Sequence, residues 1–229
     1  MVTEFVGTNR LGDTIGLVIA NIDSQLKEKM NIGTRYNSIG IVGARTGAGP
    51  HIFAADEAVK STNSEILSIE LPRDTKGGGG HGSLIIFGAD DVSDVRKAVE
   101  ICLADLERTF GDVYGNDAGH LEFQYSARAS QALVKGLGAE KGKAFGITVA
   151  SPAAIGVILA DTAVKAAAVE VRAYSSPGHG TSYSNEVILG ISGDSGAVKQ
   201  AIISAREVGI ELLTAMGDRP ESTTKPYIL

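Results

Sequence analysis

The sequence predicts an α/β protein, more closely an α+β sandwich of two similar halves, each with helices over a mixed sheet. Two observations support this prediction. The chain contains an internal repeat: ADEAVK at 55–60 returns as ADTAVK at 160–165, and the 105-residue offset holds without a gap to Pro72 and Pro177. In each half, an apolar strand is followed by apolar residues at helical spacing. The repeat therefore sets the organisation of the whole chain.

The elements of the first half follow in order. LVIANIDSQLKEKM at 17–30 is typical of a strand that passes into a short helix. IGIV at 39–42 predicts a strand, the ADEAVK helix comes next, and SEILSIELP at 64–72 predicts another strand. A glycine-rich stretch then leads to an apolar strand and to a helix with a core stripe. This stripe consists of Val95, Ala98, Val99, Cys102 and Leu106.

The second half repeats this order. LEFQYSARASQALVKG at 121–136, FGIT at 145–148 and VEVRAYSSP at 169–177 match the three strands named above. The stripe of the last helix consists of Val198, Ala201, Ile202, Ala205 and Gly209. Glycines and acids interrupt the pattern at 108–122, so we expect a first domain at 1–112 and a second at 113–229. We expect the tail at 217–229, which has two prolines and no periodicity, to be a loosely attached arm.

The composition limits the classes of function. The 229 residues carry a formal net charge of −6, so we expect no nucleic-acid partner. Apolar runs such as IGLVIANI at 15–22 are too short to span a bilayer and no signal peptide precedes them, so we expect no membrane association and a cytoplasmic location. Cys102 is the only cysteine, which excludes an intrachain disulfide.

Two strings imitate catalytic or nucleotide-binding motifs. GARTGAGPH at 43–51 follows a predicted strand, but its glycines do not match the dinucleotide-binding pattern and its counterpart VASPAAIG lacks them. We therefore interpret it as a tight turn. GDSG at 193–196 matches the tetrapeptide around the nucleophile of trypsin-like proteases, but a predicted helix follows it. We expect Asp194 or Ser195 to be the N-cap of that helix and predict no catalytic residue.

The glycine stretch PRDTKGGGGHGS at 72–83 has a partner in the other half. It is not a Walker loop, because Lys76 precedes the glycines. SSPGHGTSYS at 175–184 occupies the same place in the second half, and paired loops favour a symmetric location over one active site. The histidines, at 51, 81, 120 and 179, show no metal-binding spacing, so we expect no metal and no cofactor.

The order of strand, A-D-x-A-V-K helix, V-E strand, glycine loop, I-I strand and helix, present twice, resembles the bacterial microcompartment shell domain in tandem. The stretches that carry the resemblance to shell proteins of propanediol-utilisation microcompartments are SIGIVGARTGAGPHIFAADEAVK and YSSPGHGTSYSNEVILGISGD. The strand and helix ahead of each repeat fit the circularly permuted form of this ferredoxin-like domain. The resemblance also implies an N-terminal extension, and we expect this chain, which starts at MVTEFV, to lack it.

The resemblance implies a non-enzymatic homotrimer in which six domains mimic a hexamer. Such a trimer is a tile of the microcompartment shell and contacts other shell proteins along its edges, for which we expect exposed cations such as Lys27, Lys29 or Arg35. The resemblance also implies that the glycine loops surround a central pore. The loop residues are Lys76, Gly77, Gly78, Gly79, Gly80 and His81 from one half, with Pro177, Gly178, His179 and Gly180 from the other.

We also expect a channel within each subunit, because GARTGAGPH departs from VASPAAIG where a channel wall needs donors and acceptors. Glycerol or 1,2-propanediol would form hydrogen bonds along such a wall without binding tightly. The expected wall residues are Arg45, Thr46, Gly47, His51, Glu70, Arg73, Asn116, Asp117 and His120. The alternative that the residues leave open is a small-ligand or nucleotide-binding α/β protein that uses the glycine-rich loops.

Overall fold

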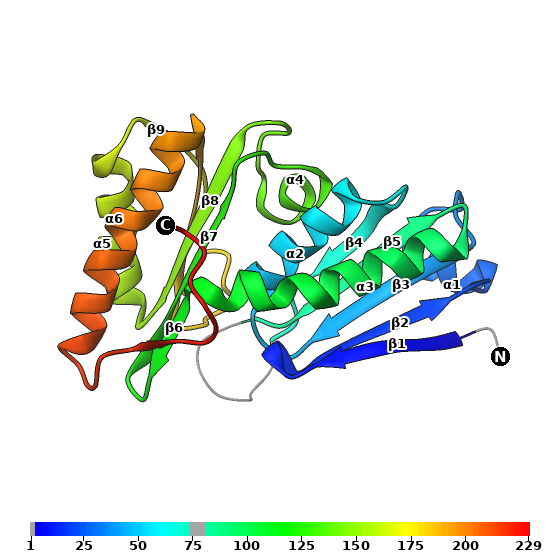
Figure 1. Cartoon of the computed structure of the whole chain (residues 1–229), viewed down its shortest axis with the longest axis horizontal. Coiled ribbons are helices and arrows are strands. Elements are labelled where there is room, and N and C mark those ends of the chain that lie inside the picture. Colours follow the sequence, from blue (N-terminus) through cyan, green and yellow to red (C-terminus); the bar gives the residue numbers. More distant parts are fainter. Residues whose placement is uncertain (1–2, 74–80) are drawn as a thin grey trace. The chain divides into compact units, whose positions relative to one another are not determined.

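The computed structural model describes residues 3–73 and 81–229, which form two compact units (Figure 1). Unit 1 contains the described residues of Met1–Asp74 together with His81–Leu106 and Ser130–Gly136. Unit 2 contains Glu107–Ala129 and Leu137–Leu229. Each unit combines one sheet with helices, as the sequence predicts.

Unit 1 has a five-stranded sheet in the order β1-β2-β3-β5-β4. Its strands are β1 (Thr3–Asn9), β2 (Thr14–Ile19), β3 (Ser38–Ala44), β4 (Glu65–Glu70) and β5 (Ser83–Ala89). Its helices are the 3-10 turn η1 (Leu11–Asp13), α1 (Ser24–Lys29), α2 (Ala48–Lys60) and α3 (Val92–Thr109), which runs into unit 2. Most of α4 (Gln131–Leu137) also belongs to this unit.

Unit 2 has a six-stranded sheet in the order β11-β6-β7-β8-β10-β9. Its strands are β6 (Val113–Asn116), β7 (Gly119–Ser126), β8 (Ala144–Ser151), β9 (Val169–Ser175), β10 (Val187–Gly193) and β11 (Glu221–Ser222). Its helices are the 3-10 turn η2 (Phe110–Asp112), α5 (Ala153–Ala166) and α6 (Ser195–Thr214). Apart from β11, the two sheets therefore share one strand order. The strands β1, β6 and β11 were not predicted by the sequence patterns.

Within the described residues, the strands pair antiparallel throughout, so the expectation of mixed sheets is wrong. The reason is the position of β5, which pairs antiparallel with both β3 and β4. The two strands that α2 connects consequently run parallel to each other without being neighbours. The strands β8, β10 and β9 repeat this arrangement in unit 2.

Both predicted helix stripes are buried, and a glycine in the neighbouring strand lets each helix approach its sheet closely. A Cβ on Gly40 of β3 would lie 2.8 Å from Val99 Cγ2 of α3. A Cβ on Gly146 of β8 would lie 2.8 Å from Ile202 Cγ1 of α6. In unit 2, α5 and α6 lie side by side on one face of the sheet (Figure 1), around a core that includes Phe123. The glycines of IGIV and FGIT are thus explained by close packing.

The segment Ser130–Gly136 belongs to unit 1, although it lies in the second half of the sequence. The compact units therefore do not divide the chain at a single residue. The domain limits 1–112 and 113–229 follow the sequence repeat, and they stay a prediction. Within the described part of the chain, the helices are too short or too polar to cross a bilayer.

The C-terminal tail is anchored, so the expectation of a loosely attached arm is wrong. The buried Asp112 carboxylate accepts hydrogen bonds from the backbone N–H groups of Tyr227 (2.9 Å) and Ile228 (3.0 Å). Arg206 donates to the same carboxylate and to the carbonyl of Ile228 (2.7 Å). The Ile228 side chain is buried in the core of unit 2. These are single tertiary contacts, which leave no periodic pattern in the sequence.

Two further expectations concern side chains at helix ends. Asp194 occupies the N-cap position of α6 as predicted, but its side chain accepts no capping hydrogen bond.

Lys27, expected at an exposed edge, is buried, and its Nζ donates to Tyr36 O (3.2 Å) and to Asn37 Oδ1 (2.8 Å). An edge role for Lys27 is therefore wrong for this chain. Its methylene groups cover the apolar interior while its ammonium group is satisfied locally.

Replacing Asp112 by Asn will destabilise unit 2 by about 3–5 kcal/mol, because Arg206 loses its buried counter-charge. Urea unfolding measures the free energy, and limited proteolysis reports release of the tail. Asp218→Asn, at an exposed carboxylate in the same tail, is the matched control and should leave both measurements unchanged. Equal stability of the two variants would contradict the anchoring role of Asp112.

Candidate functional site

In unit 1, the turn after β3 lies against two other loops. The N–H groups of Arg45 and Thr46 donate to the carbonyl of Gly12, at 2.8 Å and 3.3 Å. Gly47, the N-cap of α2, has a φ of 81°, a left-handed conformation that favours glycine. The N–H of Ala48 donates to His81 O at 3.0 Å. The structure thus brings the predicted channel residues 45–47 next to His81. His81 is the first described residue after the glycine run.

His51 is fully buried beneath this turn. Its Nδ1 bonds to the carbonyl of Gly47, and its Nε2 lies 2.7 Å from Thr14 Oγ1. Burial lowers the pKa of His51 to about 4, so the ring is neutral at physiological pH. A Cβ on Gly12, where φ is 70°, would lie 2.7 Å from this ring. These contacts give His51 a structural role in the turn, and its place in a channel wall stays a prediction.

The remaining predicted residues of unit 1 lie at the base of the glycine loop. Glu70 ends β4 and is exposed, and Arg73 forms an isolated antiparallel bridge with His81. The N–H of Gly82 closes the base by donating to Pro72 O at 2.8 Å. Lys76, Gly77, Gly78, Gly79 and Gly80 lie outside the described residues. The central-pore prediction for those five positions therefore stays a prediction.

In unit 2, the predicted residues Asn116 and Asp117 lie in the turn between β6 and β7. The side-chain carbonyl of Asn116 accepts from the N–H groups of Ala118 (2.9 Å) and Gly119 (3.2 Å). Its amide donates to the carbonyl of Asp218 at 2.7 Å. Asn116 therefore stabilises the turn and the tail, whereas Asp117 is exposed. The sequence predicts that Asn116 lines a channel wall, and the structure shows that its side chain makes these local hydrogen bonds.

His120 lies on β7 in a cluster with two acids that sequence reasoning missed. Its Nε2 is 3.8 Å from Glu186 Oε2 and has no hydrogen-bond partner among the residues that the structure describes. Burial lowers the pKa of His120, although the charge of Glu186 acts in the opposite direction. Glu122, two residues along the same strand, is buried, and burial together with the charge of Glu186 raises its pKa to about 8. Glu122 is therefore largely protonated at neutral pH.

The glycine loop of unit 2 is a compact turn after β9. Ser176 and His179 exchange two backbone hydrogen bonds, at 2.7 Å and 2.8 Å, around Pro177 and Gly178. The residues 178–180 are exposed, and Gly180 has a φ of 94°. Ser182 and Tyr183 follow with positive φ values of 50° and 64°, which are strained for such residues. The loop therefore presents His179 at the surface on a turn that two backbone hydrogen bonds close.

The arrangement defines a class of protein. The two units repeat one order of five strands, and within the described residues no cluster of three or more His, Cys, Asp or Glu side chains suits a metal ion. The units differ in their loops and in which side chains fill a space or cover a face, while the order of these strands is kept. This is the organisation of a tandem-repeat structural protein that works through symmetric assembly.

Comparisons with known proteins identify the family. The model of the BMC domain matches residues 38–116 and 144–217, starting at β3 and at β8. The bacterial microcompartment shell protein PduB of Citrobacter freundii is 65% identical over 226 residues, covering 99% of this chain and 83% of that protein. PduB of Limosilactobacillus reuteri (strain DSM 20016) is 53% identical over 227 residues, covering 99% and 95%.

Solved structures agree with this result. The crystal structure of a trimeric bacterial microcompartment shell protein PduB matches with a TM-score of 0.95 and 53% identity, over 98% of this chain and 99% of that chain. The structure of EtuB from Clostridium kluyveri matches with a TM-score of 0.94 and 54% identity, over 98% of both chains. The chain belongs to the BMC-domain family of bacterial microcompartment shell proteins, and it is a structural component of such a shell. The predicted tandem shell domains are confirmed.

Glu122 makes stability depend on pH. Its pKa of about 8 in the folded state lies above the ordinary value of 4.5, so between these pH values the folded state keeps a proton that the unfolded state has lost. The free energy of unfolding therefore falls as pH rises from about 5 to 8, by up to about 1.4 kcal/mol per pH unit. Glu122→Gln, which cannot ionise, will flatten this decline in urea unfolding across that range. Glu211→Gln, at an exposed glutamate of the same unit, is the control. An unchanged slope in Glu122→Gln would contradict the assignment.

Proposed function

We propose that three copies of this chain form a ring-shaped shell tile whose pores pass small polar molecules such as 1,2-propanediol and glycerol. The observation that supports the ring is a difference between two equivalent faces. In unit 1, the face formed by α2 and β4 is covered by α4. In unit 2, the equivalent face formed by α5 and β9 is exposed. Because a helix covers this face in one unit and the equivalent face of the other unit is exposed, a helix of a further copy can cover the second face, which favours assembly.

The covered face is held by a buried carboxylate. Asp56 on α2 accepts hydrogen bonds from the N–H groups of Ser130, Ala132 and Leu133, at 3.0–3.2 Å, where α4 begins. Lys60 pairs with the same carboxylate at 3.0 Å. An acid at the first amides of a helix satisfies donors that have no partner within the helix. On the same face, Ile52 of α2 is buried beside Gly136 of α4.

The repeat offset of 105 residues maps this face onto unit 2. Val157 and Ile158 stand where Ile52 and Phe53 stand, and their exposed fractions are 49% and 48% against 0% and 2%. Asp161 takes the position of Asp56 and keeps the pairing with a lysine four residues later, at 2.6 Å. On the neighbouring strand, the exposed Val171 corresponds to the buried Ile66. An apolar face of this kind marks an interaction surface.

The occupant that fits this face is α1 of another copy. α1 follows β2 as α4 follows β7, and Leu26 lies three residues after Asp23 as Leu133 lies three residues after Ser130. Leu133 is fully buried, whereas Leu26 is 47% exposed. Asp23 caps its own helix through the N–H groups of Gln25 (2.9 Å) and Leu26 (3.1 Å). This contact between copies therefore depends on apolar packing and does not need Asp161 as a cap.

Such a contact joins different surfaces of the two copies, and contacts of this kind close into a ring when the rotation allows. A ring of three chains is supported by the related structure that is described as trimeric, at a TM-score of 0.95. In this ring the glycine loops of the six units surround the axis. The role is non-enzymatic, and the other shell proteins of the compartment contact the outer edges of the tile.

Placing a charge on the open face tests the ring. Ile158→Glu will convert the assembly from about 71 kDa, three chains of 23.7 kDa, to a single chain, because a carboxylate would be buried without a partner. Native mass spectrometry measures the mass, and circular dichroism checks that the variant is folded. Met216→Glu, at an exposed apolar residue outside the face, should remain trimeric. A folded Ile158→Glu variant of trimeric mass would refute the proposed contact.

Narrowing the turn after β3 tests the diol channel. Thr46→Trp will slow entry of 1,2-propanediol several-fold, because the bulky ring would fill the proposed wall beside Gly47. The measurement is the rate of diol consumption by an encapsulated diol-converting enzyme, in shells that contain the variant as their tandem-domain tile. Asn63→Trp, at an exposed residue after α2, is the matched control. Unchanged flux with Thr46→Trp would place the passage elsewhere.

A further inference from the structure

Unit 2 contains a pocket of about 750 Å³ where α6 begins. Elements far apart in the sequence contribute to it, from the residue after β7 to the first residue of α6. The lining residues are Ala127, Gly142, Lys143, Ala144, Ala168, Val169, Glu170, Ser192, Gly193, Asp194 and Ser195. None of them belongs to the glycine loops or to the predicted channel wall, so this pocket requires a separate explanation.

The equivalent position in unit 1 is filled. β8 pairs with β10 in the register in which β3 pairs with β5, so Ser192 corresponds to Gly88. Gly142 and Tyr36 both stand two residues before the first residue of their strand, β8 or β3. Tyr36 is buried, and a Cβ on Gly88 would lie 2.7 Å from its ring and 2.6 Å from Leu67 Cδ1. In unit 2 the aromatic ring is replaced by a glycine. The pocket is therefore a feature of one repeat and is not required by the fold.

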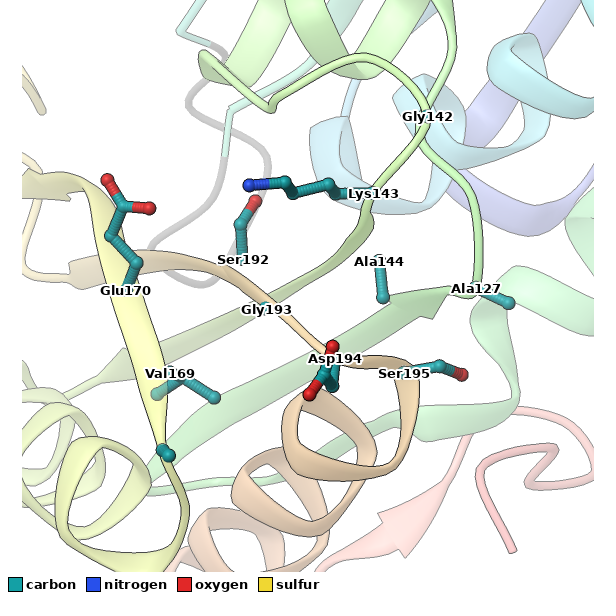
Figure 2. Close-up of a pocket in the computed structure, with 11 residues that line it drawn as sticks. Ala127, Gly142, Lys143, Ala144, Val169, Glu170, Ser192, Gly193, Asp194 and Ser195 are labelled. Atoms are coloured by element: carbon teal, nitrogen blue, oxygen red, sulfur yellow. The ribbon is translucent and has the colours of Figure 1, made fainter.

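The floor of the pocket carries a hydroxyl group that the fold does not satisfy. Ser192 is only 1% exposed, and its Oγ has no hydrogen-bond partner in the described structure. Figure 2 shows the Ser192 side chain pointing to the side of its strand on which the ammonium group of Lys143 lies. A buried hydroxyl without a partner is costly, and the cost is recovered when a ligand supplies one.

Lys143 places a lysine side chain where unit 1 has an amide side chain. Its counterpart by strand register is Asn37, whose side-chain oxygen accepts from Lys27 at 2.8 Å. The Lys143 side chain is about half exposed and pairs with Glu140 at 3.0 Å, an exposed contact that water screens. The ammonium group can therefore turn towards an anion beside Ser192 at little cost.

The start of α6 adds backbone donors. This helix is 20 residues long, and Asp194 at its N-cap position makes no side-chain hydrogen bond to the first turn. The first amides of a long helix favour negative charge. Ser195, the first residue of the helix, is held by a hydrogen bond between its hydroxyl group and that of Tyr125. The helix start, Lys143 and Ser192 thus offer donors to one ligand.

Two carboxylates restrict the kind of anion. Asp194 and Glu170 also line the pocket, and Glu170 is paired with Arg172 at 2.9 Å. A bare anion would be repelled by these acids, whereas a ligand with hydroxyl groups would donate hydrogen bonds to them. We propose that this pocket binds a small hydroxylated anion, a phosphate or carboxylate on a polyol, with the anionic group at Lys143, Ser192 and the start of α6. This site goes beyond the proposed shell function.

Titration calorimetry on the full chain in its native assembly tests the proposal. The probes are glycerol 3-phosphate, glycerate, inorganic phosphate and glycerol. We expect glycerol 3-phosphate or glycerate to bind with a dissociation constant at least about tenfold below that of inorganic phosphate, and glycerol to show no binding. The stronger of the first two probes identifies the anionic group as phosphate or carboxylate.

Variants that restore the residues of unit 1 locate the site. Ser192→Gly and Lys143→Asn should each weaken binding of the better probe by about tenfold or more. Lys141→Asn removes an exposed lysine two residues away that does not line the pocket, and its affinity should stay within about twofold. Thermal unfolding checks that all three variants are folded.

Several results would overturn the proposal. They are the absence of binding by any probe up to about 10 mM, equal binding of inorganic phosphate and glycerol 3-phosphate, and equal loss of affinity in Lys141→Asn and Lys143→Asn. None of these results bears on the trimer, because the native mass of the assembly is measured separately.

Discussion

The contact between the Asp56 carboxylate and the first amides of α4 is the interaction on which the rest of this structure depends. It holds Ser130–Gly136, a segment of the second repeat, inside unit 1. The compact unit is consequently not a contiguous half of the chain. The same contact covers one apolar face, whereas the equivalent face on α5 has no cover among the described residues. The exposed apolar face on α5 favours association with a further copy of the chain.

The two units keep one scaffold and differ where a single residue changes what fills a space. Gly40 and Gly146 serve the same close packing of a helix on a sheet. Tyr36 fills a position at which Gly142 leaves a pocket, and Ser192 places a hydroxyl group where Gly88 places none. Duplication therefore supplied a repeated core, and the differences between the copies are concentrated in loops and pockets.

Much of the scaffold followed from pattern alone. The helix stripes around Val99 and Ile202 were predicted correctly, because helical periodicity is a local property of the sequence. The anchored tail was not predicted, because Asp112 and Ile228 meet only in the folded chain. The channel wall stays a prediction. Positions 45–47 lie beside His81, and His51 and Asn116 make local contacts that stabilise their own turns.

The repeat, the α+β class, the family, and the order of helices and strands apart from the short or terminal strands β1, β6 and β11 are evident from the sequence. These features are periodic or local, so the order of residues is enough to reveal them. Which faces are covered, that burial raises the pKa of Glu122 to about 8, and that Ser192 Oγ has no hydrogen-bond partner among the described residues are evident only from the folded chain. Burial and hydrogen bonding depend on residues that are distant in the chain, and one sequence does not say which distant residues meet.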